Sequence, residues 1–207
     1  GAVGNNEFGI SGVNQKVKIM SIIVSGFKTS TLIKGFDYII KMKKRWLETN
    51  GREGANIVAT NSSFGEDREF CHQEKFKVWN ELYNKLGKLG VLSVAATTND
   101  NINVDLEGDV PTSCSSEFLI TVTNINKFGS KRRSAGYGKR SIDLGAPGTE
   151  IYSTTPGNRF MARTGCSYAA PHVTGAIGFL HSIASKKFAL LYRQNPEVSA
   201  IVLKNTL

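Results

Sequence analysis

Residues 165–176 read Gly-Cys-Ser-Tyr-Ala-Ala-Pro-His-Val-Thr-Gly-Ala, and this stretch decides the expected fold. Small and apolar residues dominate it, so it predicts a buried helix that a neighbouring segment can approach closely. Pro171 fits an early helical turn, because the N–H that proline lacks has no helical partner there. Ser167 would stand at the N-terminus of this helix. That position suits either a capping hydroxyl or a nucleophile whose attack creates an oxyanion.

The whole run resembles the serine motif of the subtilisin-like serine proteases (subtilases), G-T-S-[MY]-A-[AST]-P-H-V-[AST]-G-[AVG]. Cys166 in place of threonine is the departure from that pattern. A match of this length is far more specific than a three-residue motif. The resemblance implies that Ser167 is the nucleophile of a serine endopeptidase. It also implies that His172 is a structural helix residue and not the catalytic base.

The composition is that of an ordinary globular chain, with 207 residues, 40% of them hydrophobic and 21% charged. We expect a single domain, residues 1–207, with a sizeable core. No apolar run is long enough to predict a membrane span. The formal net charge of +9 is concentrated in residues 41–45 and 131–133. Because no aromatic residues interleave with these charges, we expect a solvated helix face and a solvated loop, and no nucleic-acid partner.

The three cysteines show no metal-ligand spacing, and an odd number cannot all pair within one chain. A bridge between Cys71 and Cys114 could form, but the pattern does not establish it. Cys166 is interpreted as a small buried hydrophobe.

The order of the expected elements predicts an α/β fold. Apolar, β-branched strands alternate with amphipathic helices, which favours a mostly parallel sheet with right-handed crossovers and helices on both faces, in three layers. The expected strands are 17–24, 55–62, 90–97, 118–123 and 151–154. The expected helices are 31–47, 75–89, 167–184, 186–194 and 197–206, the last with Pro196 at its start.

The apolar run 90–97 leads to Asn99, and strand ends are where α/β sheets place functional side chains. An isolated turn asparagine is the plainer alternative. The run resembles the family's V-x-A-A-A-G-N-[ED]-[GN], which implies that Asn99 is the side-chain donor of the oxyanion hole. Thr98 replaces the usual glycine, so it would narrow the first specificity pocket or shift the backbone there.

Residues 61–65 resemble the family motif N-x-S-[LFW]-G. The resemblance implies that Ser63, Phe64 and Gly65 line the substrate cleft, where a peptide would pair with the backbone as an added strand. The polar segment 66–74 is expected to form a loop at the cleft rim. Asp143 lies in a motif resembling [VI]-D-[LV]-x-A-P-G, which implies a structural role.

The Gly/Asn-rich segment 1–13 predicts a loop and resembles one that supplies a calcium site in some subtilases. By that resemblance Asn6 could bind calcium together with the carbonyls of Gly4, Phe8 and Ile10. Calcium takes six or more oxygens, and these residues offer about four. No cofactor is required for the expected reaction, so the metal would be structural.

Serine hydrolysis also needs a base near the hydroxyl and a carboxylate that orients the base. The family's D-[ST]-G and H-G-T-H-V-A-G motifs are absent. We favour an N-terminally incomplete subtilisin-like domain that lacks the first strands. A catalytically dead relative that binds peptides, or replacement of the missing residues by others, are the alternatives. Two histidines are the candidates for such a replacement of the base. His72, in the rim loop, could reach Ser167, whereas His181 lies about 20 Å along the helix from Ser167, which is too far for contact.

These interpretations carry further expectations. The chain alone would show no peptidase turnover. An incomplete sheet would expose core surface, so the chain would self-associate. The family resemblance implies a peptide or protein substrate and a secreted, periplasmic or cell-envelope location. A non-catalytic peptide-binding scaffold is the alternative function.

Overall fold

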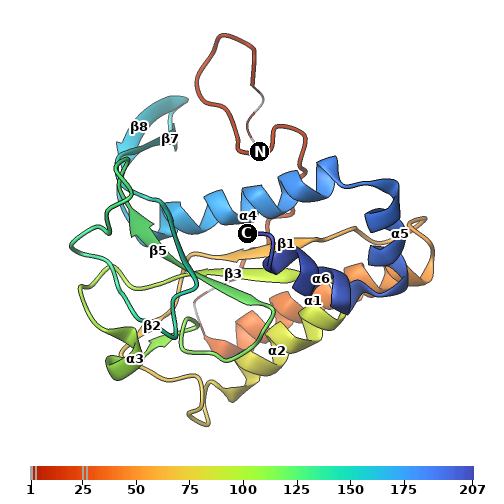
Figure 1. Cartoon of the computed structure of the whole chain (residues 1–207), viewed down its shortest axis with the longest axis horizontal. Helices are drawn as coiled ribbons and strands as arrows, with labels where there is room; N and C mark the ends of the chain where they lie inside the picture. Colours follow the sequence, from red (N-terminus) through yellow and green to blue (C-terminus); the bar gives the residue numbers. More distant parts are fainter. Residues whose placement is uncertain (1, 3, 25, 27) are drawn as a thin grey trace.

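A parallel sheet lies at the centre of the molecule (Figure 1). The structure is a computed structural model that describes residues 2, 4–24, 26 and 28–207. Among these residues the sheet has the strand order β1-β3-β5-β6, and each neighbouring pair is parallel. The strands are β1 (Ala59–Ser62), β3 (Leu92–Ala96), β5 (Leu119–Ile125) and β6 (Leu144–Pro147). The predicted parallel α/β sheet is therefore confirmed, and its strands end at a common carboxyl edge.

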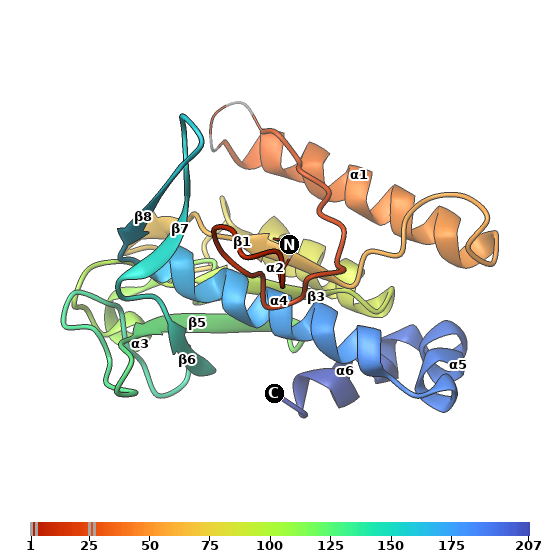
Figure 2. The ribbon, with the colours of Figure 1, turned by 90° about the horizontal axis from the view of Figure 1, so that it is seen from above.

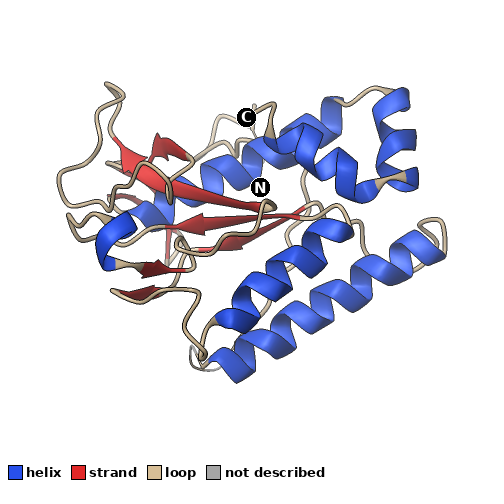
Figure 3. Cartoon of the chain, turned by 60° about the horizontal axis from the view of Figure 1, so that its bottom comes forward, coloured by secondary structure: helices blue, strands red, loops and turns tan. Residues whose placement is uncertain are grey.

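Helices cover both faces of this sheet, as Figure 3 shows. On one face α2 (Lys77–Lys88) packs against the sheet beside α1 (Thr29–Glu48). On the other face lies α4 (Cys166–Ile183). Its buried positions are small or β-branched, namely Cys166, Ala169, Ala170, Val173 and Ile177. These short side chains allow the helix to lie close to the sheet, which gives the predicted three-layer α/β/α arrangement.

The remaining elements gather at the two ends of the sheet (Figure 2). A β7–β8 hairpin stands at the end where α4 begins, and α5 and α6 lie near the other end. The bounds are α3 (Val104–Glu107), β7 (Ile151–Thr155), β8 (Arg159–Arg163), α5 (Lys186–Gln194) and α6 (Pro196–Lys204), with a short antiparallel pair of β2 (Glu66–Asp67) and β4 (Asp109–Val110). Within the described residues, no helix is long and apolar enough to cross a membrane.

The predicted strand at 17–24 is wrong. Among the described residues this segment has no ladder partner, and it runs from α4 to α1. A Cβ added at Gly178 of α4 would lie 3.3 Å from Val17, and one added at Gly35 of α1 would lie 3.1 Å from Ile22. Strand propensity reflects how a side chain fits a sheet surface, and this apolar segment forms no ladder. As a result Ile23 is 95% exposed.

We predict that residues 1–207 self-associate through this segment. Ile19 and Ile23 are 75% and 95% exposed, and apolar surface of this kind drives association. Sedimentation velocity at increasing concentration should show growing oligomers, and Ile19→Lys with Ile23→Lys should reduce them. Val198→Lys with Val202→Lys places the same charges on exposed positions of α6 and serves as the control. A monomer at every concentration would contradict the prediction.

One residue of the basic run 41–45 is not solvated. Lys43 of α1 is fully buried, and its Nζ donates to Asn56 Oδ1 at 2.7 Å and to Tyr192 Oη at 2.9 Å. The ring centroids of Trp46 and Tyr192 lie 4.7 and 4.5 Å from this nitrogen. Burial lowers the pKa of Lys43 to about 7. The expected solvated face is therefore wrong at this position, because α5 covers it.

A disulfide joins Cys71 to Cys114, with their Cα atoms 4.9 Å apart. It fastens the loop after β2 to the segment that follows β4. The sequence left this pairing open. Cys166 is a free thiol that is fully buried, as interpreted from the sequence.

Candidate active site

Two strand ends and one helix N-terminus meet at the carboxyl edge of the sheet. The Cys166 backbone N–H, in the first turn of α4, donates to Asn99 Oδ1 at 2.8 Å. Ser63, directly after β1, donates its hydroxyl to the Ser167 carbonyl at 3.0 Å. The Ser167 hydroxyl in turn lies 3.5 Å from the Ser63 carbonyl, to which it donates. The structure thus brings together Ser167, Asn99 and Ser63, which the sequence places far apart.

The backbone that leads into α4 is held tightly. The Gly165 N–H donates to the Gly148 carbonyl at 2.9 Å. A Cβ at Gly148 would lie 2.7 Å from the Gly165 carbonyl oxygen, so this approach requires glycine. The Ser167 N–H lies at the positive end of an 18-residue helix. Within the described chain this N–H has no hydrogen-bond partner, so it is free to donate to an anionic ligand.

The orientation of the Asn99 amide follows from its partner. Because Oδ1 accepts the Cys166 N–H, Nδ2 is the group left to donate outward. The side chain is exposed, and in the described part of the chain no acceptor contacts Nδ2. Nδ2 and the Ser167 N–H are therefore two uncommitted donors beside the Ser167 hydroxyl.

Hydrogen bonds between polar side chains link β1 and the residue after it to α4. Thr174 of α4 donates to Asn61 Oδ1 at 3.0 Å, and Asn61 Nδ2 donates to the Ser63 hydroxyl at 3.0 Å. At Gly65 an added Cβ would lie 2.1 Å from the Val110 carbonyl oxygen, so the backbones of β2 and β4 can meet here only through glycine. Phe64 is half-buried, and its ring packs edge-on against Trp79.

Comparison with known proteins decides the family. Residues 1–206 match the model of the subtilase family. This chain is a subtilase.

Three relatives show the extent of the likeness. Alkaline elastase YaB of Bacillus sp. (strain YaB) is 28% identical over 204 residues, covering 98% of this chain and 45% of the relative. Subtilisin Savinase of Lederbergia lenta is 26% identical over 203 residues, covering 98% and 64%. Subtilisin-like protease 2 of Plasmodium falciparum is 34% identical over 101 residues, covering 49% and 8%. The chain thus spans about half the length of the first curated relatives it matches.

A solved structure shares the fold. It is described as the crystal structure of a cold adapted subtilisin-like serine proteinase and superposes with a TM-score of 0.59 at 22% identity. The match covers 77% of this chain and 50% of that one. At this identity the likeness shows the subtilisin-like fold, in agreement with the parallel sheet and its flanking helices.

Beneath the candidate site of this subtilase, Thr98 adjoins a buried carboxylate. The Thr98 N–H and the Thr97 hydroxyl donate to Asp109 Oδ2 at 3.0 and 2.9 Å, and the Thr112 hydroxyl donates to the same oxygen. Asp109 is 2% exposed. Burial raises its pKa to about 6, against the effect of the three donors, while the charge of Asp67 adds to the rise. Sequence reasoning missed Asp109, because Thr97 and Thr98 reach it only when the fold places β4 beside the end of β3.

We expect Asp109 to make stability depend on pH. Its pKa is higher in the folded than in the unfolded state, so the native protein binds more protons between about pH 4 and pH 6. The free energy of unfolding should therefore fall by about 3 kcal/mol as the pH rises through this window. Urea unfolding at a series of pH values should show a flatter profile for Asp109→Asn than for the unsubstituted protein. Glu48→Gln removes an exposed carboxylate from α1 as the control, and equal profiles in the two variants would contradict the prediction.

The three histidines of this subtilase lie apart from the Ser167 hydroxyl. In the described chain none of them donates to it or accepts from it. His172 Nδ1 lies 2.8 Å from the Tyr168 carbonyl within α4, as expected for a helix residue. His72 is exposed and stacks on Phe70, and His181 packs edge-on against Tyr192. Burial lowers the pKa of His181 to about 4, and the nearby Lys43 charge adds to the effect.

Two further residues from the sequence analysis, Asp143 and Asn6, have hydrogen-bond partners outside the group of Ser167, Asn99 and Ser63. Asp143 Oδ2 accepts the N–H and the hydroxyl of Thr121 at 2.8 and 2.9 Å, which ties the start of β6 to β5. Asn6 is exposed, and its Oδ1 accepts the Phe8 N–H at 3.3 Å. Among the described residues no group of three or more His, Cys, Asp or Glu side chains could hold a metal. A calcium site at Asn6 stays a prediction.

Proposed function

We propose that the protein is a serine endopeptidase in which Ser167 is the nucleophile. The observation that carries this proposal is the 2.8 Å hydrogen bond from the Cys166 N–H to Asn99 Oδ1. This bond fixes an amide donor beside a hydroxyl at the N-terminus of a long helix. The membership of the subtilase family supports the same reaction.

In this proposal the Ser167 hydroxyl attacks the carbonyl carbon of a peptide bond. The carbonyl oxygen becomes negatively charged and would receive hydrogen bonds from Asn99 Nδ2 and from the Ser167 N–H. Preorganised donors of this kind stabilise the transition state more than the substrate, because the charge develops only during the reaction. The positive end of the α4 dipole acts in the same direction.

The substrate would lie along residues 63–65, with its backbone added to the edge of the cleft. Ser63 and Asn61 hold this wall through their hydrogen bonds to α4, which supports a role for Ser63, Phe64 and Gly65 in substrate binding. Thr98 would limit the space for the side chain before the scissile bond, because it is packed between Asp109 and Gly136.

A base and an orienting carboxylate are still needed, and we propose that residues outside this chain supply them. The Ser167 hydroxyl has the Ser63 carbonyl as its hydrogen-bond partner in the described part of the chain. During attack the hydroxyl proton must pass to a general base, and the Ser63 carbonyl is too weak a base to take it. The same observation favours the second candidate, a scaffold that binds peptides without cleaving them.

The test compares hydrolysis of a mixed peptide library by the full-length protein and by residues 1–207 alone. Under the endopeptidase proposal the full-length protein cleaves internal bonds and the shorter chain does not. Binding of peptides by both forms with cleavage by neither would favour the scaffold. Turnover by residues 1–207 alone would overturn the proposed division of the catalytic residues.

We also propose that the protein acts in a secreted or cell-envelope compartment. The Cys71–Cys114 disulfide supports this location, since such bonds persist in oxidising surroundings.

A further inference from the structure

A hollow opens directly beside Asn99. It has a volume of about 330 Å³ and is lined by Asn99, Asp100, Asn101, Arg132, Arg133 and Ser134. Two chain segments that are about thirty residues apart form it, namely the turn after β3 and the loop after β5. Since Asn99 is also the candidate oxyanion donor, this pocket adjoins the point where a peptide bond would be cleaved.

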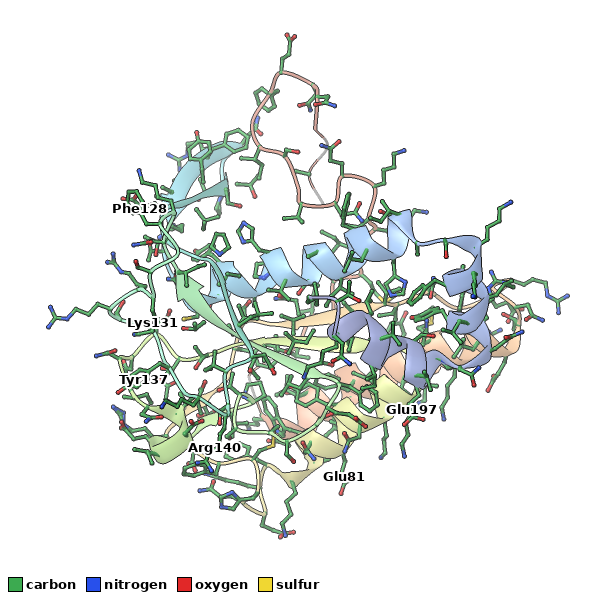
Figure 4. The ribbon with its side chains drawn as sticks, in the orientation of Figure 1. Glu81, Phe128, Lys131, Tyr137, Arg140 and Glu197 are labelled. Atoms are coloured by element: carbon green, nitrogen blue, oxygen red, sulfur yellow. A yellow bond between two sulfur atoms is a disulfide. The ribbon has the colours of Figure 1, made fainter. Side chains whose placement is uncertain are left out.

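The loop that carries the two arginines is fixed in place. Lys131 Nζ donates to the carbonyls of Arg132 and Ala135 at 3.0 and 2.8 Å, and to Asn101 Oδ1 at 3.0 Å. It also lies 5.2 Å from the centroid of the Tyr137 ring, and Figure 4 shows both residues on this side of the molecule. Lys131 therefore joins the two walls of the pocket through its own ammonium group.

The lining of the pocket carries more positive than negative charge, with two arginines and one aspartate. Among the described residues, no carboxylate forms an ion pair with the guanidinium of Arg132 or of Arg133. The one acidic residue of the lining, Asp100, already faces Arg68, with Nη2 and Oδ2 3.8 Å apart. Guanidinium groups bind carboxylates with two parallel N–H donors, so two unpaired arginines in a hollow suit an anionic guest.

We infer that this pocket binds an acidic side chain, Asp or Glu, of the peptide substrate within about two residues of the scissile bond. An extended peptide advances by about 3.3 Å per residue, so a residue this close to the reacting carbonyl can reach a pocket lined by Asn99. The inference rests on the proposed endopeptidase function, because it names a preference of that same cleft. Arg132 and Arg133 are then specificity-determining residues.

The experiment uses the full-length protein and paired peptides that differ only by Glu or Gln at the two positions on each side of the cleaved bond. We expect kcat/KM to be about tenfold higher for the best-placed Glu, a modest factor because the arginines are exposed. Arg132→Gln with Arg133→Gln should remove this preference, so that the ratio of kcat/KM for the Glu and Gln peptides falls to about one. Lys34→Gln with Lys44→Gln removes the same two charges from exposed positions of α1 and should keep the preference.

The salt dependence provides a second readout. A preference that arises from exposed charges should shrink as the salt concentration rises from about 50 to 500 mM, whereas one that arises from shape should not. Hydrolysis with equal rates for Glu and Gln peptides would overturn the inference while the proposed function stands. A preference that survives in the arginine double variant would overturn it as well.

A separate measurement distinguishes failure of the proposed peptidase function from failure of the pocket. If no peptide is cleaved, fluorescence anisotropy with the Ser167→Ala protein measures binding of the same paired peptides directly. Tighter binding of the Glu peptide that depends on Arg132 and Arg133 would support the pocket even though the protein is not a peptidase. Equal binding of the two peptides would overturn the pocket.

Discussion

Replacing Ser167 by alanine in the full-length protein is expected to lower kcat by roughly 10⁶-fold, the magnitude that loss of the nucleophile has in subtilisin itself. The reason is that no other hydroxyl occupies this position at the N-terminus of α4. The Ser63 hydroxyl is committed to the Ser167 carbonyl at 3.0 Å. Steady-state kinetics with an internally quenched peptide would measure the change.

Ser182→Ala is the matched control for this variant. It removes a hydroxyl from the opposite end of the same helix, where it donates to the Phe179 carbonyl at 2.7 Å. We expect its kcat to be unchanged within about twofold, since surface substitutions of this kind are nearly neutral. A Ser167→Ala protein that retains substantial turnover would refute the assignment of the nucleophile.

Asn99→Ala is expected to lower kcat by about 10²- to 10³-fold with little change in KM. This expected magnitude is taken from the oxyanion-hole asparagine of subtilisin. The effect falls on kcat because the hydrogen bond from Nδ2 strengthens only as the oxyanion forms. Stopped assays at saturating and limiting substrate would separate the two constants.

The Asn99 side chain also holds the first turn of α4, so the alanine variant alone does not isolate its chemical role. Asn99→Asp keeps the oxygen that accepts the Cys166 N–H and removes the outward donor. We expect it to lose at least as much activity as Asn99→Ala with little loss of stability. Recovery of activity in Asn99→Asp would show that Asn99 acts by positioning α4 and not by donating to the oxyanion.

Much of the fold could be predicted from periodicity. The apolar spacing of α1 and α2 predicts their boundaries to within a few residues, because each helix buries one face against a neighbour. The helix α4 was predicted from its small, apolar residues and the serine motif. The failure at residues 17–24 has a physical cause. Composition shows that Ile19, Ile22 and Ile23 favour a strand, but it does not show whether another strand lies alongside. In the structure the segment instead packs against glycines of α1 and α4.

The candidate site was predictable where a motif is continuous, as around Ser167, Asn99 and Ser63. The resemblance also implies that Ser167 and Asn99 lie close together, as nucleophile and oxyanion donor. The hydrogen bonds between Ser63 and Ser167 could not be predicted, because they depend on the order of the strands in the sheet. The pocket of Arg132 and Arg133 was also unpredictable. A basic run is usually a solvated loop, and only the fold brings this one beside Asn99. The burial of Lys43 could not be predicted either, because it depends on where the fold places Tyr192.

The disulfide closes a covalent ring across a sequence separation of 43 residues. This ring contains α2, β3, Asn99 and Asp109, whereas Ser63 and Ser167 lie outside it. A disulfide limits the separation of the residues inside its ring when the chain unfolds. It therefore restrains Asn99, which lies inside the ring, but not Ser63 or Ser167. Detachment of α4 would carry Ser167 away from Asn99, and the disulfide would not oppose that movement because α4 lies outside the ring.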